Sequence, residues 1–126
     1  MKKAILLVSH GSYSPEAKRE VLKLKSLLKR KSGTAIFKHA FLEINRPNIP
    51  AGITACVKKG ATDVIVLLNF LNSGEHVRRD IPRLIRGAKK KYPHVSFRMS
   101  LPIGQQKKIS DLFIDLVRKT HLLKNI

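Results

Sequence analysis

The sequence predicts a three-layer α/β fold in which helices flank a four-stranded parallel sheet. Short apolar runs alternate four times with amphipathic helical segments, and this alternation is typical of parallel strands joined by right-handed crossover helices. The third run, residues 63–68, is almost wholly apolar, as expected for a strand that is covered on both faces. The predicted fold therefore has one sheet with helices on both sides.

Residues 4–8 are the first predicted strand, and a helix follows them. Ser14 suits the N-cap of this helix, Pro15 suits its first position, and Gly33 ends the unit. The apolar residues of the helix recur at three- and four-residue spacing on one side, away from its lysines: Ala17, Val21, Leu24 and Leu28. This spacing indicates an amphipathic helix.

The second unit begins with a strand at residues 34–42. A loop at residues 43–48 follows, and a short helix runs from about residue 50 to residue 59 and ends at Gly60. Cys56 lies on the apolar face of this helix and is expected in the core. Because it is the only cysteine, an intrachain disulfide and a CxxC metal site are excluded.

The second half of the chain repeats the pattern. The central strand at residues 63–68 leads through a polar loop to a helix at about residues 81–91, and Asp80 is interpreted as its N-cap. A weaker strand at residues 95–99 precedes the last helix. The apolar residues of this last helix are expected inside the protein: Ile109, Leu112, Phe113, Leu116 and Val117.

The length and composition fit a single domain over residues 1–126. With 43% hydrophobic residues, the chain suffices for one packed core and is too short for two ordinary domains. No apolar run approaches the roughly 20 residues of a membrane-spanning helix, and the start of the chain lacks the features of a signal peptide. We therefore expect a cytoplasmic protein.

The net charge of +18, from 26 Lys and Arg against eight Asp and Glu, predicts attraction to polyanions. Nucleic acid, an anionic membrane surface and a small substrate with many carboxylates or phosphates all fit. A basic, solvated surface without a specific anion site is the alternative, because the tightest lysine clusters lie at helix ends, where the helix dipole favours cations.

Two histidines follow core strands directly. His10 comes after the first strand and His76 after the third. The expected strand order is 2-1-3-4, as in flavodoxin-like folds, where the winding direction reverses between strands 1 and 3 and ligands bind at that point. The fold therefore predicts that both histidines lie at one crevice, although 66 positions separate them.

Two imidazoles at a crevice, with Glu43 and Glu75 also at strand ends, form an N/O ligand set that suits cobalt, nickel, iron or zinc. Two protein ligands leave coordination positions open, as a site that hands on its metal requires. The alternative is structural, with His10 as a turn residue and His76 as a helix cap.

Basic side chains beside the proposed site suit an anionic substrate. Arg78 and Arg79 can pair bidentately with carboxylates, although solvent exposure is the alternative for both. The predicted substrate-binding residues are Ser12, Glu43, Arg46, Ser73, Gly74, Arg78 and Arg79.

Four motifs, which follow one another in the order seen in a known family, give the chain a resemblance to that family. LLVSHGS, FLEINRP, VIVLLNFLNSGEHVRRDIP and LPIG, between residues 4 and 120, are similar to those of the small single-domain class II tetrapyrrole chelatases, which insert a metal ion into sirohydrochlorin. The resemblance implies that His10 and His76 bind the metal. It also implies a homodimer, equivalent to the two fused halves of larger relatives.

The chain departs from the family pattern at three places. Tyr13 stands where an arginine is common, Glu75 replaces a second glycine, and Gln105, Gln106 and Lys107 replace a histidine-and-proline sequence. The first change removes an expected anion contact, and the second places an acid beside His76. Both histidines remain.

The implied activity is that of a lyase-class chelatase in tetrapyrrole biosynthesis, for example of cobalamin. Cobalt, nickel or ferrous iron would be a substrate, and no organic cofactor is implied. His10 and His76 would present the ion, Glu75 would assist proton removal or ligation, and Arg78 and Arg79 would orient the macrocycle rim.

Two other functions compete with this one. Histidine phosphatases also place a histidine and glycine after the first strand, but there an arginine precedes the histidine, and here the residue is Ser9. A basic nucleic-acid-binding module fits the charge, yet the chain has no recognised binding motif and only 6% aromatic residues.

Overall fold

A four-stranded parallel sheet with the order β2-β1-β3-β4 forms the centre of the computed structural model. The structure describes residues 2–124 and, at His76, the backbone alone. The strands are β1 (Lys3–Ser9), β2 (Ile36–Phe41), β3 (Asp63–Leu68) and β4 (Ser96–Met99). Leu7 of β1 pairs with His39 on one side and with Leu67 on the other. The predicted strand order is confirmed, and the carboxyl ends of β1 and β3 are neighbours.

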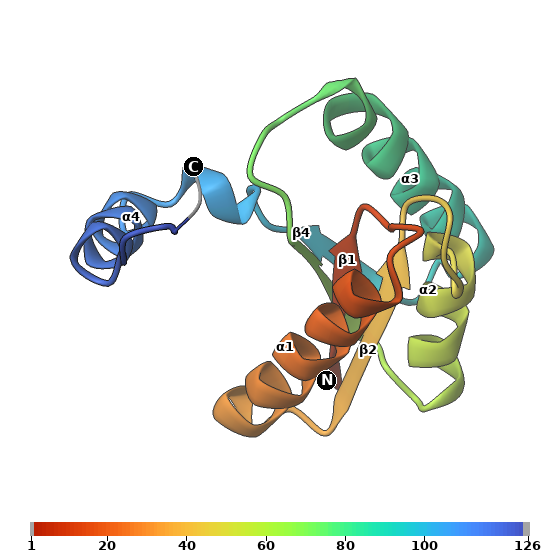
Figure 1. Cartoon of the computed structure of the whole chain (residues 1–126). Helices are drawn as coiled ribbons and strands as arrows, with labels where there is room; N and C mark the ends of the chain where they lie inside the picture. Colours follow the sequence, from red (N-terminus) through yellow and green to blue (C-terminus); the bar gives the residue numbers. More distant parts are fainter. Residues whose placement is uncertain (1, 125–126) are drawn as a thin grey trace.

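Helices lie on both faces of this sheet, and the last helix stands away from it (Figure 1). They are α1 (Pro15–Ser32), α2 (Ile49–Lys58), α3 (Ile81–Lys91) and α4 (Ile109–Arg118), with a π-helical turn η1 (His76–Asp80) and a 3₁₀ turn η2 (Ile103–Gln105). α2 and α3 lie together on one face, and α1 covers part of the other (Figure 1). None of the helices in residues 2–124 combines the length and apolarity needed to cross a bilayer.

The ends of α1 have the predicted caps. The Ser14 hydroxyl accepts a hydrogen bond from the Ala17 amide, Pro15 takes the first position, and Gly33 closes the helix in the left-handed conformation. At α3, Asp80 takes the predicted N-cap position but does not cap the helix with its side chain. Because η1 runs directly into α3, the backbone at Asp80 is already helical and its side chain makes no capping bond.

The hydrophobic core lies on the α2/α3 face. Alternate residues of β1 and β3 point into it, since successive side chains of a strand face opposite sides. Cys56 is fully buried there, as predicted. The fully buried side chains of this core include Leu6, Val8, Ile49, Ile53, Cys56, Val64, Val66, Leu68, Ile81 and Val95.

The α1 face is covered much less. No residue of α1 is buried, and a groove of about 400 Å³ opens between α1 and the end of β3. Its apolar lining includes Leu7, Leu24, Leu28, Leu67, Leu101 and Ile103. Part of this face therefore lacks a covering helix.

The predicted burial of α4 is wrong. No residue of α4 is buried, and the helix stands away from the sheet and the other helices (Figure 1). Consecutive backbone hydrogen bonds lead from Pro102 through η2 into α4, including those from the Gln105 amide to the Pro102 carbonyl and from the Ile109 amide to the Gln106 carbonyl. This continuous turn directs α4 away from its own sheet.

Candidate metal centre

The backbone hydrogen bonds between β1 and β2 continue past the strand ends. The Leu42 amide donates to the Ser9 carbonyl at 2.9 Å, and the Glu43 amide donates to the His10 carbonyl at 3.1 Å. Residues 10 and 43 are thus held side by side at the carboxyl edge of the sheet, where open α/β folds bind ligands.

The side chains of these two residues meet. His10 Nε2 lies 2.8 Å from Glu43 Oε1, and each side chain is about half exposed, at 52% and 48%. The ring of Phe70 meets the imidazole edge to face, with 6.4 Å between ring centroids. The imidazole therefore has a fixed orientation with a carboxylate beside it and open space around the pair.

Gly11 allows this close approach of the two loops. Its φ is +108°, and a Cβ at this position would lie 1.9 Å from the Glu43 carbonyl oxygen. Next to it, the Ser12 amide donates to the Asn45 side chain at 2.7 Å. Position 11 therefore requires glycine, because any side chain there would push the Glu43 loop away.

The loop after β3 joins the same edge. The Asn69 amide donates to the Val8 carbonyl at 2.9 Å, and the Asn69 side chain donates to the Ser9 hydroxyl at 3.0 Å. A pocket of about 270 Å³ lies between the two loops. It is lined by His10, Phe70, Leu71, Asn72, Gly74 and Val77.

His76 belongs to this second loop. It is the first residue of η1 and lies between Gly74 and Val77, which both line the pocket with His10. Its side chain lies outside the described residues, so the meeting of the two imidazoles stays a prediction. The side chains that are described contain no cluster of three His, Cys, Asp or Glu residues able to hold a metal ion.

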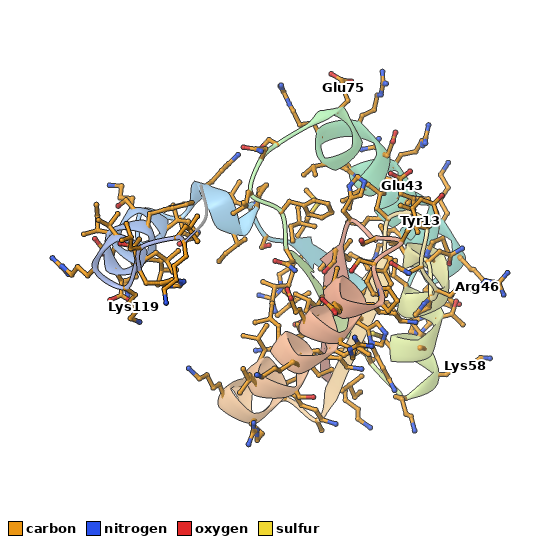
Figure 2. All side chains as sticks on the ribbon, viewed as in Figure 1. Tyr13, Glu43, Arg46, Lys58, Glu75 and Lys119 are labelled. Atoms are coloured by element: carbon orange, nitrogen blue, oxygen red, sulfur yellow. The ribbon has the colours of Figure 1, made fainter. Side chains whose placement is uncertain are left out.

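Glu75 lies apart from the His10 and Glu43 pair. Its carboxylate is 3.4 Å from the Arg79 guanidinium, and both side chains are about three-quarters exposed. Figure 2 shows Glu75 at the outer tip of the loop before α3, separate from Glu43 and Tyr13. Of the two acids predicted near the metal, Glu43 is the one that contacts His10.

The other predicted substrate-binding residues differ in exposure, and of them only Gly74 lines this pocket. Ser12 is half-buried, whereas Arg46 and Arg78 are exposed, and Arg46 lies on the α2 side (Figure 2). The Gly74 carbonyl accepts the Arg78 amide at 3.0 Å and so begins the helical turn. The Ser73 hydroxyl accepts a hydrogen bond from Gln105.

The turn before α4 supports the loop that carries the pocket. The Gly104 amide donates to the Phe70 carbonyl at 3.1 Å, and a Cβ at Gly104 would lie 1.9 Å from the Leu71 carbonyl oxygen. Because Phe70 touches His10, the turn stabilises the surroundings of the imidazole. Sequence reasoning gave no role to Phe70 or Asn69, since only the spatial proximity of the two loops reveals one.

The 2.8 Å between His10 Nε2 and Glu43 Oε1 is the distance of a hydrogen bond between the two side chains. It is also close to the about 3 Å that separates neighbouring ligands of an octahedral ion at about 2.1 Å. An imidazole nitrogen and a carboxylate oxygen suit divalent transition ions. The arrangement can hold such an ion and leave open the side that faces the pocket.

The chain matches the CbiX family over residues 4–120. It is 43% identical to a sirohydrochlorin cobaltochelatase of Priestia megaterium over 104 residues, which are 81% of this chain and 33% of that protein. It is 32% identical over 123 residues to a sirohydrochlorin cobaltochelatase of Saccharolobus islandicus (strain L.S.2.15 / Lassen #1). The match covers 93% of this chain and 94% of that protein.

A solved structure shares the fold. The sirohydrochlorin chelatase SirB from Bacillus subtilis subspecies spizizenii, in complex with cobalt, superposes with a TM-score of 0.88 at 32% identity. The match covers 94% of this chain and 51% of that chain. This chain therefore spans about a third of the Priestia protein and about half of SirB.

Proposed function

The chain belongs to the CbiX family, and from that premise we propose that it inserts a divalent metal ion into sirohydrochlorin during tetrapyrrole biosynthesis. The observation that carries this proposal is the contact between His10 Nε2 and Glu43 Oε1 at 2.8 Å. His10 also lines a pocket at the carboxyl edge of the sheet.

His10, Glu43 and His76 are the proposed metal ligands. The first two already stand at ligand spacing, and the backbone of His76 begins the turn on the opposite side of the same pocket. A site with one side open retains the ion weakly enough to release it to the macrocycle. The ion in turn favours the deprotonated pyrrole nitrogens, because it stabilises negative charge on them.

Metal insertion also needs an acceptor for the pyrrole protons. We assign this step to Glu75, whose carboxylate is exposed and follows Gly74, a residue of the pocket rim. Glu43 stays with the ion because it is paired with His10. This division gives each acid a separate role and makes the two experimentally distinguishable.

The basic surface suits the substrate. Sirohydrochlorin carries many carboxylates, and a net charge of +18 attracts such an anion from a distance. Arg46 and Arg78 are exposed, and Arg79 lies 3.4 Å from the Glu75 carboxylate. The arginines are the proposed contacts of the rim carboxylates, with Ser12, Ser73 and Gly74 nearer the ion.

Cobalt is the proposed ion, with nickel and ferrous iron as the competing substrates. The cobaltochelatase relatives and the cobalt-bound SirB structure support cobalt. We also propose that two copies of the chain act together as a homodimer. Support comes from length, because one copy corresponds to about half of SirB.

The test follows the Soret absorbance of sirohydrochlorin mixed with protein and with cobalt, nickel or ferrous iron. The wild type should accelerate insertion, and a His10→Ala, His76→Ala double variant should not. Glu43→Gln should lower kcat/KM by about 10- to 100-fold, since it weakens a metal ligand. Equal rates for the wild type and the double variant with every metal would refute the proposal.

Glu75→Gln is the matched control for Glu43→Gln. Both changes remove one negative charge from the same region while keeping the shape of the side chain. If Glu43 binds the ion, Glu43→Gln should raise the cobalt concentration needed for half-maximal rate, whereas Glu75→Gln should lower kcat and leave that concentration unchanged. The reverse result would exchange the two assigned roles.

A further inference from the structure

Ile44 has a backbone conformation that isoleucine rarely takes. Its φ is +72°, in the left-handed region, where a β-branched side chain is crowded against its own backbone and glycine is the favoured residue. The Asn45 amide donates to the Glu43 carbonyl at 2.8 Å. A hydrogen bond that spans one residue of positive φ makes a γ-turn of the rare and strained kind. Residues 43–45 therefore form a tight turn with the isoleucine at its centre.

Both neighbours of Ile44 are fixed to the loop after β1. The Glu43 amide donates to the His10 carbonyl at 3.1 Å, and the Glu43 carboxylate lies 2.8 Å from His10 Nε2. The Asn45 side chain accepts a hydrogen bond from the Ser12 amide at 2.7 Å. A strained residue persists where the contacts around it determine its conformation. The positive φ of Ile44 is therefore a consequence of the way in which the two loops are joined.

The fold gives no reason for an isoleucine at this position. Glycine or asparagine takes a positive φ more readily. The side chain of Ile44 is 44% exposed, and among the described residues it neither belongs to the hydrophobic core nor packs against it. One residue thus combines a strained backbone with an exposed apolar side chain, directly after a proposed metal ligand. A contact that forms only when a ligand is bound would explain both.

A second exposed apolar side chain lies on the other side of His10. The strand order β2-β1-β3 places the loop after β1 between the loop after β2, which carries Ile44, and the loop after β3, which carries Leu71. Leu71 is 60% exposed and lines the same pocket as His10. A ligand that covers His10 and reaches both neighbouring loops therefore finds an exposed apolar side chain on each.

The chemistry of these positions fits a flat ring with apolar faces and a charged rim. Metal insertion brings the centre of the macrocycle to the ion, so its pyrrole carbons lie around the ion while its carboxylates extend outward. The Cα of Ile44 is about 3.8 Å from that of Glu43, one residue along the chain. An apolar side chain so close to the ion is suited to the ring carbons, because contact removes both surfaces from water.

We propose that the side chain of Ile44 contacts the ring face of the tetrapyrrole, and that the strained turn is retained because of this contact. Ile44 then contributes to the affinity for the macrocycle and not to the affinity for the ion. This inference rests on the proposed function, since it requires a macrocycle at the site. It predicts that relief of the strain stabilises the chain and that loss of the side chain weakens substrate binding.

The first test compares the stability of Ile44→Ala and Ile44→Gly. Both variants remove the apolar atoms beyond Cβ, and only glycine also removes the Cβ that a positive φ disfavours. At ordinary positions alanine gives the more stable protein. A higher urea midpoint for Ile44→Gly than for Ile44→Ala is therefore the expected sign of strain at this residue. The opposite order would overturn the proposal, because the turn would then be unstrained.

The second test measures the KM for sirohydrochlorin in the Soret assay and the Kd for sirohydrochlorin, without metal, by fluorescence titration. Ile44→Ala and Ile44→Gly should each raise both constants by about 5- to 20-fold, because the apolar contact is lost. Ile44→Val keeps most of the side chain and should raise them by about fourfold or less. Weak binding by Ile44→Gly with normal binding by Ile44→Ala would overturn the contact, since mobility of the turn would then be the cause.

The cobalt dependence separates this contact from a role in placing Glu43. The hydrogen bonds of the turn are made by residues 43 and 45, so they remain in both variants. The cobalt concentration needed for half-maximal rate should therefore stay unchanged. An increase in that concentration in proportion to the increase in KM would overturn the proposal, because it would show that Ile44 acts through the carboxylate beside it.

The wild type separates this inference from the function on which it rests. A wild type that neither binds sirohydrochlorin nor inserts metal into it would refute the proposed function and, with it, the contact. A wild type that inserts metal, together with Ile44→Ala and Ile44→Gly variants whose KM and Kd are unchanged, would overturn the contact alone.

Discussion

The two faces of the sheet differ in how they are covered. On the α2/α3 face, side chains of two helices and three strands form a continuous core with many fully buried residues. On the α1 face, one helix without a buried residue lies over part of the sheet, and a groove remains beside it. The first face is closely packed, whereas the second leaves an apolar groove open.

The difference shows where stability and function reside. Apolar burial stabilises by about 25 cal/mol per Å², so the α2/α3 face accounts for most of the hydrophobic stabilisation of a single copy. The candidate metal centre lies at the edge between the faces, where the loops after β1, β2 and β3 meet. The strands that carry these loops also form the core, so the core positions the site.

The largest difference between the faces is expected on truncation of apolar side chains. Ile53→Ala, on the packed face, should lower the free energy of unfolding by about 2 to 5 kcal/mol, because it leaves a cavity in a buried cluster. Leu27→Ala, on α1, should cost about 0.5 kcal/mol, since Leu27 is 40% exposed. Urea unfolding at one protein concentration measures both, and equal losses would contradict the comparison.

A smaller effect is expected where the turn before α4 meets the loop after β3. Gly104→Ala should destabilise by about 1 to 3 kcal/mol, because its Cβ would collide with the Leu71 carbonyl. It should also slow metal insertion, since the loop carries Phe70. Gly87→Ala is the control: nothing lies within 4 Å of a Cβ there, and it should stabilise α3 by about 0.5 to 1 kcal/mol.

The stability and the insertion rate of Gly104→Ala together show what the turn before α4 supports. A loss of stability there without a loss of insertion rate would mean that the turn supports only the fold. A fall in insertion rate that is larger than the increase in unfolded protein can explain would mean that the turn also positions the residues of the site. Thermal unfolding and the Soret assay on the same preparations separate the two.

The smallest effect is expected from the polar contact that holds α1 to the sheet. Lys25 Nζ lies 3.0 Å from His39 Nδ1. Burial, followed by the positive charge of Lys25, holds the pKa of His39 below its usual value of 6.5. The unfolded chain therefore binds this proton more readily than the folded chain.

The sign of the pH dependence follows from that difference. His39 contributes stability above pH 6.5, and the contribution is lost as the pH falls through the lowered pKa. Between pH 7.5 and 5, the urea midpoint of the wild type should therefore fall more than that of His39→Gln. His94→Gln, at an exposed position, should behave like the wild type. An identical pH dependence for all three chains would exclude this role of His39.

The sequence predicted the architecture well because the signals for it are local. Alternating apolar runs and caps such as Ser14 determine where strands and helices lie, and the crossover rule supplies their order. The family resemblance was also readable from motifs in order, and the match over residues 4–120 confirms it. The proximity of the loops that carry His10 and His76 followed from that order.

The features that sequence reasoning missed depend on contacts between distant segments. An amphipathic stripe such as that of α4 has the same spacing whether it packs against its own chain or another, so the prediction of its burial was wrong. The contact of Glu43 with His10 depends on the register of β1 and β2. No local pattern specifies that register. From its position in the sequence alone, Glu75 was as good a candidate as Glu43 for the acid beside His10.

The close approach at Gly11 restricts how this protein can vary. A single added carbon would overlap the Glu43 carbonyl oxygen, so even the smallest replacement, alanine, displaces the carboxylate that faces His10. A library randomised at this codon and screened for coloured product should return glycine alone. Neighbouring Tyr13, 89% exposed, should accept many amino acids in the same screen, so tolerance changes sharply within two residues.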